Sequence, residues 1–165
     1  MGRNYEIDMS RLEAMFQRLS PQNIQSFEGL AIEEALTELQ KDTISILVSK
    51  LPNATKTGTT PNGVKTDAMT KGVKKTVDRH YATGTVHIMG DYRLKWFELG
   101  TNPRYTTGAR NKFRSGDIKK TVSAGQYRGQ IQPIHFFKEA RENANIIEAY
   151  RQSLLMSIEN AFNGQ

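Results

Sequence analysis

The fold of this chain is decided by one stretch, "SPQNIQSFEGLAIEEALTELQKDTISILVSKLP", residues 20–52. Ser20 is a favoured N-cap residue, and Pro21 follows at the first helical position, where the missing N–H of a proline costs no hydrogen bond. Pro52 stops the helix at the other end. The sequence therefore predicts one long helix that starts after Ser20 and ends at Leu51.

The spacing of apolar residues predicts which side of this helix is buried. Positions three or four apart share a helical face. The predicted buried stripe consists of Ile32, Leu36, Leu39, Thr43, Ile46, Leu47 and Leu51. The opposite side carries residues that we expect to be solvated, namely Glu33, Glu34, Glu38 and Lys41. Gly29 weakens the helix near its start and predicts a kink.

The segment before this helix is predicted to be a helical extension. It comprises residues 1–21, and residues 22–165 form the core of a single domain. Within residues 8–19 the apolar side chains repeat at helical spacing and would share one face: Met9, Leu12, Met15, Phe16 and Leu19.

The middle of the chain predicts strands separated by polar loops. Residues 52–72 have almost no apolar content and are rich in Gly, Thr, Asn and Pro, so we predict a long flexible loop. The next stretch alternates like a β-hairpin with its turn at residues 82–84. "YRLKWFELGT", residues 92–101, predicts a third strand. Residues 102–130 predict a second flexible, basic excursion, a long hairpin anchored by Tyr105, Phe113 and Tyr127.

The last part of the chain predicts one long helix that begins within "IQPIHFFKEA", residues 131–140. Its predicted inward face consists of Phe137, Ala140, Ala144, Ile147, Leu154, Ile158 and Phe162. The order of elements describes an α+β domain. An antiparallel β-sheet would pack against the long N-terminal and C-terminal helices and carry long polar loops.

Composition argues against several classes of site. The chain contains no cysteine, which excludes disulfides, thiol nucleophiles and thiolate metal sites. His80, His87 and His135 lack the i, i+4 spacing of a helical metal site, so no metal is expected. No phosphate-binding glycine loop or serine-hydrolase elbow occurs, and no cofactor is expected. The chain begins with no signal-peptide pattern and contains no membrane-length apolar run, so we expect a soluble, cytosolic protein.

Positive charge is concentrated in the middle of the chain. Residues 50–130 hold 16 Lys or Arg and 5 Asp or Glu, whereas the remaining residues hold 7 and 12. Such a block can bind an acidic protein surface or the phosphates of DNA, although no DNA-reading motif accompanies it. The candidate contacts are Lys71, Lys74, Lys75, Arg79, Arg104, Arg110, Lys112, Arg114, Lys119 and Lys120.

An isolated acid in the apolar run at residues 95–104, "KWFELGTNPR", raises the question of catalysis. A metal nuclease needs two or more acids that converge on a cation. Asp91 follows Gly90 at a predicted turn, where Asp is common for backbone reasons, and Glu98 has no lysine two residues later. We therefore predict that the chain is not an enzyme. Glu98 would be a structural acid that orients the corner at Gly100 or pairs with Arg104.

Two segments resemble a known protein family. "LKWFELGTNPR", residues 94–104, and "PIHFFKEA", residues 133–140, resemble paired motifs of the small tail-component, or tail-completion (neck), proteins of long-tailed bacteriophages of the siphophage type. The resemblance covers roughly residues 25–162. His135 and Glu139 stand where family members usually have proline, and the excursions at 52–72 and 102–130 match nothing in the family. The positions that carry the resemblance are Trp96, Phe97, Glu98, Gly100, Thr101, Pro133, Phe136, Phe137 and Ala140.

The resemblance implies a structural virion protein of a phage or prophage that joins the tail tube to the head connector. Its partners would be other copies of itself, in a hexameric ring, and other neck or tail proteins, with no membrane and no cofactor. It would be found in the virion, at the head–tail neck or tail, and in the host cytoplasm during assembly. The alternative that the charges leave open is a basic, non-specific DNA-binding protein.

Overall fold

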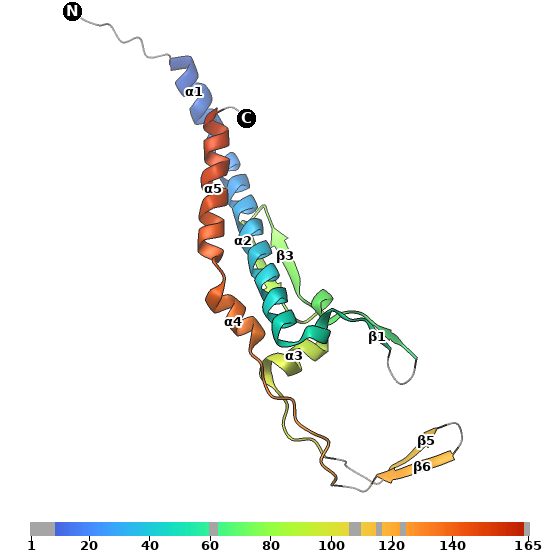
Figure 1. The fold of residues 1–165 in the computed structure, drawn as a ribbon. Coiled ribbons are helices and arrows are strands. Elements are labelled where there is room, and N and C mark those ends of the chain that lie inside the picture. Colours follow the sequence, from blue (N-terminus) through green and yellow to red (C-terminus); the bar gives the residue numbers. More distant parts are fainter. Residues whose placement is uncertain (1–8, 60–62, 106–109, 115–116, 123–124, 164–165) are drawn as a thin grey trace, which may run out of the picture.

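The structure is a computed structural model that describes residues 9–59, 63–105, 110–114, 117–122 and 125–163. It has the α+β class predicted from the sequence. A long helix, α2 (Pro21–Lys50), is the axis of an elongated molecule, and the last helix, α5 (Ile146–Asn163), lies along it (Figure 1). Among the described residues, the strands pair antiparallel in three separate two-stranded sheets. No helix among the described residues is long and apolar enough to cross a membrane.

Helix α2 spans Pro21–Lys50, as its capping residues predict. The Ser20 hydroxyl accepts a hydrogen bond from the backbone N–H of Asn23 at 3.4 Å, and Pro21 occupies the first turn. At the other end the N–H of Leu51 donates to the carbonyl of Leu47 at 2.8 Å, and a short 3₁₀ helix, Pro52–Thr55, follows. The boundaries of α2 are thus set by local chemistry.

The buried side of α2 agrees with the predicted stripe only in part. Leu39, Thr43 and Leu47 are buried as predicted, whereas Ile32, Leu36 and Ile46 are half-buried. The other buried positions hold small residues, Gly29, Ala31 and Ala35. Small side chains allow neighbouring backbones to come close. The pattern of large apolar residues in the sequence does not indicate these buried small positions.

The predicted hairpin after the first loop is confirmed, with its turn slightly earlier than expected. Strand β3, Lys74–Asp78, pairs antiparallel with β4, Thr83–His87, and both pack against α2. The turn covers residues 79–82, because the Asp78 carboxylate accepts the backbone N–H groups of His80 and Tyr81 at 3.0 and 3.2 Å. Such an aspartate turn starts the reversal before the predicted residues 82–84.

Two glycines allow this hairpin to lie directly on α2. A Cβ at Gly29 would lie 2.4 Å from the Arg79 carbonyl oxygen, and a Cβ at Gly84 would lie 2.4 Å from Leu36 Cδ1. Both distances are far inside van der Waals contact. Gly29 therefore provides a close approach between helix and hairpin, which explains its place in the helix better than the predicted kink does.

Replacing Gly29 with alanine is expected to lower the free energy of unfolding by up to about 2 kcal/mol. Alanine gains about 1 kcal/mol in helix propensity, but its methyl group must displace the Arg79 backbone, and overpacking costs about 1–3 kcal/mol. Urea denaturation followed by circular dichroism measures the change. The exposed Ser26→Ala in the same helix is the control and should be neutral or slightly stabilising. An equal increase in the free energy of unfolding in both variants would contradict the close contact between Gly29 and the Arg79 backbone.

The predicted third strand is instead a helix. Residues Tyr92–Leu99 form α3, and its N-cap is Asp91, whose side chain accepts the N–H of Arg93 at 2.9 Å. The buried residues are Leu94 and Glu98, four apart, which is helical spacing and not the alternation that the sequence suggested. A stretch this short supports either pattern, and the burial of Leu94 in the core together with the Asp91 cap makes it helical.

The region 52–72 is not the wholly flexible loop that we predicted. A hairpin of β1, Gly58–Thr59, and β2, Lys65–Thr66, projects from the body, but its two ends are anchored. The 3₁₀ helix Pro52–Thr55 buries Ala54, and a second one, Met69–Gly72, buries Met69 and Gly72. A few small apolar residues are sufficient to attach the region to the core.

The C-terminal part forms two helices where we predicted one. Helix α4 spans Phe136–Asn143, the chain leaves the helix at Ala144, and α5 spans Ile146–Asn163. The break changes the register, so the predicted inward face is wrong for several residues. Phe136 and Ala140 are buried, but Ile147 is 84% exposed and Phe162 is 42% exposed. In α1, Met9–Arg18, Phe16 is 72% exposed; the side chains of Met9, Leu12 and Met15 lie outside the description.

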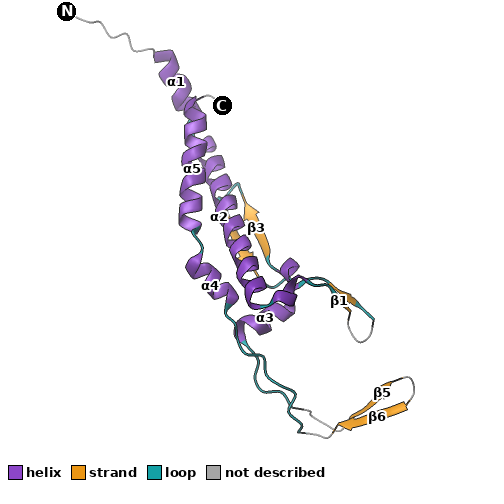
Figure 2. Cartoon of the chain, viewed as in Figure 1, coloured by secondary structure: helices purple, strands orange, loops and turns teal. Residues whose placement is uncertain are grey.

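The core lies at one end of α2, where α3, α4 and the 3₁₀ helices meet (Figure 2). Its buried members come from five separate segments: Leu47, Ala54, Met69, Val73, Leu94 and Phe136. Half-buried residues such as Phe97, Ile134 and Phe137 surround it. The two segments of the family resemblance, at 94–104 and 133–140, therefore both contribute to this core.

The second excursion is a two-stranded arm that extends away from the body (Figure 1). Its base is a paired ribbon in which the N–H of Arg104 donates to Gly129 and the N–H of Arg128 donates to Arg104. Beyond the Tyr105–Tyr127 bridge, β5, Arg110–Arg114, pairs antiparallel with β6, Asp117–Val122. The predicted hairpin form of residues 102–130 is confirmed in these strands.

Candidate functional site

The site with the most specific geometry is a junction between the end of α3 and the start of α4. Glu98 is 8% exposed, and its two carboxylate oxygens accept the backbone N–H groups of Phe137 at 2.8 Å and Lys138 at 3.0 Å. These are first-turn amides of α4, which have no acceptor within their own helix. A carboxylate is well suited to them because the helix dipole is positive at this end.

Glu98, which belongs to α3, acts as the N-cap of α4. The residue in the cap position, His135, has a left-handed backbone with φ of 49° and makes no side-chain cap hydrogen bond. The carboxylate of Glu98 replaces that cap across a sequence separation of 39 residues. The prediction that Glu98 pairs with Arg104 is wrong in the described structure, where Glu98 binds backbone amides.

A second set of contacts closes the corner after α3. Gly100 has φ of 75°, and a Cβ there would lie 2.9 Å from Pro133 Cδ and 3.0 Å from the Ile131 carbonyl oxygen. Thr101 donates its N–H to Ile131 O at 2.9 Å and accepts the Ile131 N–H on its hydroxyl at 3.0 Å. The sharp turn at Gly100 was predicted from the sequence, but it ends a helix and not a strand.

The junction brings together most of the residues singled out by the family resemblance. Phe97 accepts the N–H of Ile134 at 2.8 Å, and Phe136 and Ala140 are buried beside it. Trp96 is different, because it lies on the outer side of α3, is 40% exposed and contacts the Tyr92 ring edge to face at 5.0 Å. The junction is a structural clamp, and Trp96 belongs to the surface.

Glu98→Gln is expected to lower the free energy of unfolding by about 1–3 kcal/mol. Glutamine keeps the size of the side chain, but its amide NH₂ would face one of the two α4 N–H groups, leaving that partly buried donor without an acceptor. Thermal and urea denaturation measure the loss. Glu142→Gln, an exposed acid 3.9 Å from Lys138, is the matched control and should change stability by less than about 0.5 kcal/mol. Equal losses of stability in Glu98→Gln and Glu142→Gln would contradict the proposed role of Glu98 in holding α3 and α4 together.

The basic residues predicted to contact a partner fall into two groups. Lys71, Lys75 and Arg79 form ion pairs within the chain: Lys71 lies 3.1 Å from Asp67, and Lys75 and Arg79 both contact Glu33. The two contacts to Glu33 fasten the β3–β4 hairpin to α2, whereas the Lys71–Asp67 pair is local, and the Arg79 hydrogen bond holds the pKa of Glu33 below its ordinary value. Glu33 is therefore not part of a simply solvated face, as the sequence suggested.

The other predicted contacts remain on the surface or outside the description. Lys74 and Arg104 are exposed. The side chains of the remaining five, which belong to β5 and β6, lie outside the described structure: Arg110, Lys112, Arg114, Lys119 and Lys120. Residues 102–130 hold seven of the 23 Lys and Arg and one of the 17 Asp and Glu, so the rest of the chain is neutral. The arm thus accounts for the whole net charge of +6.

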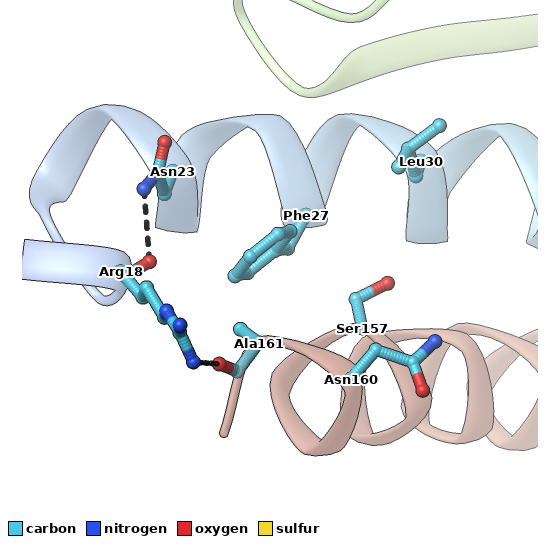
Figure 3. A pocket seen from close by; sticks show the side chains of 7 residues that line it. All are labelled: Arg18, Asn23, Phe27, Leu30, Ser157, Asn160 and Ala161. Carbon is cyan, nitrogen blue, oxygen red and sulfur yellow. Dashed lines mark hydrogen bonds between the residues drawn. The ribbon is translucent and has the colours of Figure 1, made fainter. Parts of the chain in front are cut away.

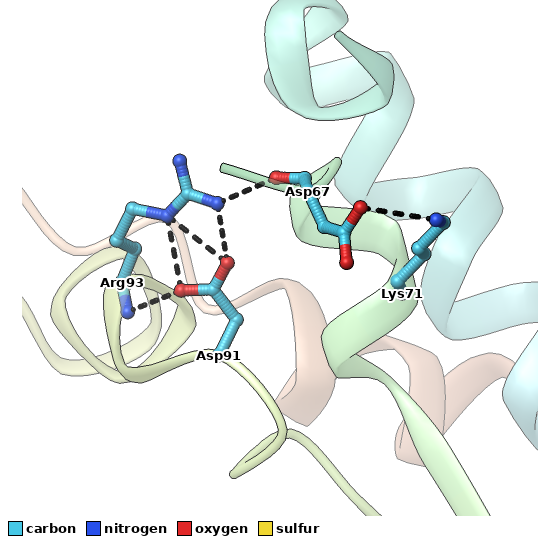
Figure 4. A network of polar contacts seen from close by, with 4 residues as sticks. All are labelled: Asp67, Lys71, Asp91 and Arg93. Carbon is cyan, nitrogen blue, oxygen red and sulfur yellow. Dashed lines mark hydrogen bonds and ion pairs between the residues drawn. The ribbon is translucent and has the colours of Figure 1, made fainter. Parts of the chain in front are cut away.

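A polar network fixes α3 to the segment before β3 (Figure 4). Both oxygens of Asp91 accept hydrogen bonds from the Arg93 guanidinium at 2.5–3.0 Å, and Arg93 also donates to the Asp67 carbonyl at 2.8 Å. The Arg93 hydrogen bonds hold the pKa of the Asp91 carboxyl below its ordinary value, and Asp91 raises the pKa of Arg93. Asp91 at the predicted turn is therefore a helix cap with a fixed ion pair.

The Asp91 pair is expected to make stability depend on pH. Because the folded-state pKa of Asp91 lies below its unfolded value of about 3.9, the pair stabilises the fold above that value and is lost as pH falls through the folded pKa. Asp91→Asn keeps a capping side chain and removes the charge. Melting temperatures from pH 6 to pH 2.5 should fall more steeply for the wild type than for Asp91→Asn. Parallel curves would show that Asp91 does not contribute.

An open groove of about 470 Å³ lies where α1 and the start of α2 meet the end of α5 (Figure 3). Arg18 donates to the Ala161 carbonyl at 3.3 Å, and Asn23 donates to the Arg18 carbonyl at 2.9 Å. Of the residues that line the groove, only Arg18 is ionisable. Such a lining offers no pair of acid and base groups. Among the described residues, no three His, Cys, Asp or Glu side chains cluster as metal ligands would.

Comparisons with known proteins identify no relative. No protein-family model, no curated protein and no solved structure matches the chain. The Glu98 clamp and the basic arm at residues 102–130 are therefore the two features of the fold that bear on function.

Proposed function

We propose that this chain is a structural virion protein of a phage or prophage, a tail-completion or neck component that joins the tail tube to the head connector as a ring. In this role it performs no chemistry. Its partners are other copies of the chain, most simply in a hexamer, and the neighbouring neck or tail proteins. It acts in the virion after assembly in the host cytoplasm.

The observation that carries the proposal is the Glu98 clamp. The two segments that resemble tail-completion proteins are far apart in sequence, yet Glu98 of the first caps the helix that the second begins. If the two resemblances were accidental, there would be no reason for the two segments to contact each other in the fold. Their contact therefore supports the interpretation that the two segments form one structural unit.

The clamp also positions the arm, which suits an assembly role. Thr101 and Ile131, at the two sides of its base, are joined by two hydrogen bonds. The following residues Arg104, Tyr105, Tyr127 and Arg128 are all exposed. Tyrosine and arginine are enriched among residues that dominate binding energy at protein interfaces. An arm with a rigid base and such residues can reach a neighbouring subunit.

Deleting the gene from the phage or prophage genome that encodes it tests the proposal. The expected result is that filled heads and separate tails accumulate, as seen by electron microscopy, with infectivity lost. Wild-type protein supplied from a plasmid should restore joined particles. Normal yields of joined, infectious particles after deletion would overturn the proposal.

A second candidate, non-specific DNA binding, is favoured by the charge of the arm. The arm alone carries the net positive charge of the chain, and lysine and arginine in extended strands can contact phosphates. Binding to duplex DNA at 50 and 200 mM salt tests it. Replacing Arg104 and Arg128 with Glu should weaken binding, and the logarithm of the affinity should fall linearly with the logarithm of salt concentration. No retention of DNA at 50 mM salt would remove this candidate.

A further inference from the structure

The outer side of α3 carries large apolar side chains that nothing in the described chain covers. Tyr92, Trp96 and Leu99 share one helical face, and their exposed fractions are 67%, 40% and 64%. Lys95 is exposed at the edge of this face. The inner side of the same helix already contributes Leu94 to the core. Helix α3 is therefore apolar on two sides, and exposed aromatic groups of this kind mark contact sites.

A second uncovered face runs along α5. None of its described residues is buried, although α5 packs along α2. Ile147, Leu155 and Phe162 are 84%, 50% and 42% exposed, and helical spacing places all three on one side. Arg151 lies between Ile147 and Leu155 on that side and is exposed. The described residues of one subunit thus leave a lateral stripe of α5 uncovered.

The α3 face is complementary in charge and in length to the first part of the α5 stripe, from Ile147 to Leu155. The Arg151 guanidinium suits the faces of the Tyr92–Trp96 pair, as in a cation–π contact. Lys95 at the edge of the α3 face can pair with Glu148, which is exposed next to Ile147. Tyr92 to Leu99 spans about 10 Å and Ile147 to Leu155 about 12 Å at a rise of about 1.5 Å per residue.

We infer that the α3 face of one copy docks on the α5 stripe of a second copy. The two surfaces differ, so the contact is heterologous and leaves one free surface of each kind on every dimer. Repetition then adds subunits in one direction and closes into a ring where the rotation allows. This inference rests on the proposed self-assembly and names the contact that makes it.

Two single variants test the contact, because each blocks one surface only. Tyr92→Asp and Ile147→Asp replace exposed side chains in the first turn of a helix, where aspartate is favoured, so both should fold. Gln22→Asp, exposed in the first turn of α2 and outside both faces, is the matched control. Circular dichroism establishes folding. Sedimentation velocity over a concentration series then measures association.

The wild type and Gln22→Asp should form larger species as concentration rises. Trp96 is the only tryptophan in the chain, so its emission should move to shorter wavelength on association. Each blocked variant alone should associate at least tenfold more weakly. Mixed together they should form a one-to-one dimer and stop there, because the mixture contains one intact α3 face and one intact α5 stripe.

Three results would overturn the contact. The wild type could stay monomeric up to millimolar concentration, both variants could assemble like Gln22→Asp, or the mixture could form no dimer. A dimer lost in Ile147→Asp but kept in Tyr92→Asp would indicate that α5 pairs with itself instead. The neck role fails on a different result, the presence of joined particles after gene deletion, so the two ideas are judged separately.

Discussion

Phe136→Ala is expected to cost about 3–5 kcal/mol of unfolding free energy, the largest loss that we expect from one side-chain truncation in this chain. Phe136 is fully buried at the start of α4 and is one of the largest side chains in the core. Truncation removes its apolar contacts and leaves a cavity beside Leu47 and Leu94. Because single domains have total stabilities of about 5–15 kcal/mol, the variant should be close to unfolding at 37 °C.

Urea denaturation followed by circular dichroism measures this loss. Phe16→Ala, which truncates the same side chain at a position that is 72% exposed, is the control and should change stability by less than about 0.5 kcal/mol. Similar midpoints for the two variants would mean that Phe136 does not lie in the core.

The second large effect is expected for Gly100→Val, which should cost about 2–6 kcal/mol. Gly100 has φ of 75° and ψ of −177°, a region that is essentially restricted to glycine and costs other residues about 1–3 kcal/mol. A Cβ would in addition lie 2.9 Å from Pro133 Cδ, and such overpacking costs about 1–3 kcal/mol more. The substitution should therefore separate the end of α3 from the start of α4.

Gly125→Val separates the two causes. Gly125 has nearly the same φ, 74°, but a Cβ there would have no neighbour within 4 Å, and it lies in the arm outside the core. Thermal denaturation should show a much smaller effect for Gly125→Val. If both variants melt like the wild type, the corner at Gly100 tolerates a side chain and the clamp is looser than its geometry implies.

Both large effects act on the Glu98 clamp, which links stability to the proposed assembly. Phe136 fills the core behind the clamp, and Gly100 ends α3 just before the arm. A weakened clamp would leave the arm without a fixed direction. Variants of the clamp that still fold are therefore expected to fail in joining heads to tails, in proportion to their loss of stability.

The sequence by itself determined the features that depend on neighbouring residues. Ser20, Pro21 and Pro52 set the ends of α2 because capping and proline geometry act within one turn. The β3–β4 hairpin and the sharp corner at Gly100 were predictable for the same reason, since each depends on a few consecutive residues.

Only the tertiary structure decided the features that depend on residues far apart. Tyr92–Leu99 is compatible with strand or helix by pattern, and burial of Leu94 against the core together with the Asp91 cap makes it helical. Glu98 accepts hydrogen bonds from the backbone N–H groups of Phe137 and Lys138, which lie 39 and 40 residues later in the sequence. Glu33 accepts a hydrogen bond from Arg79, 46 residues later. The packing of distant segments determines which hydrogen-bond donors lie next to a given carboxylate, and the carboxylate binds those donors.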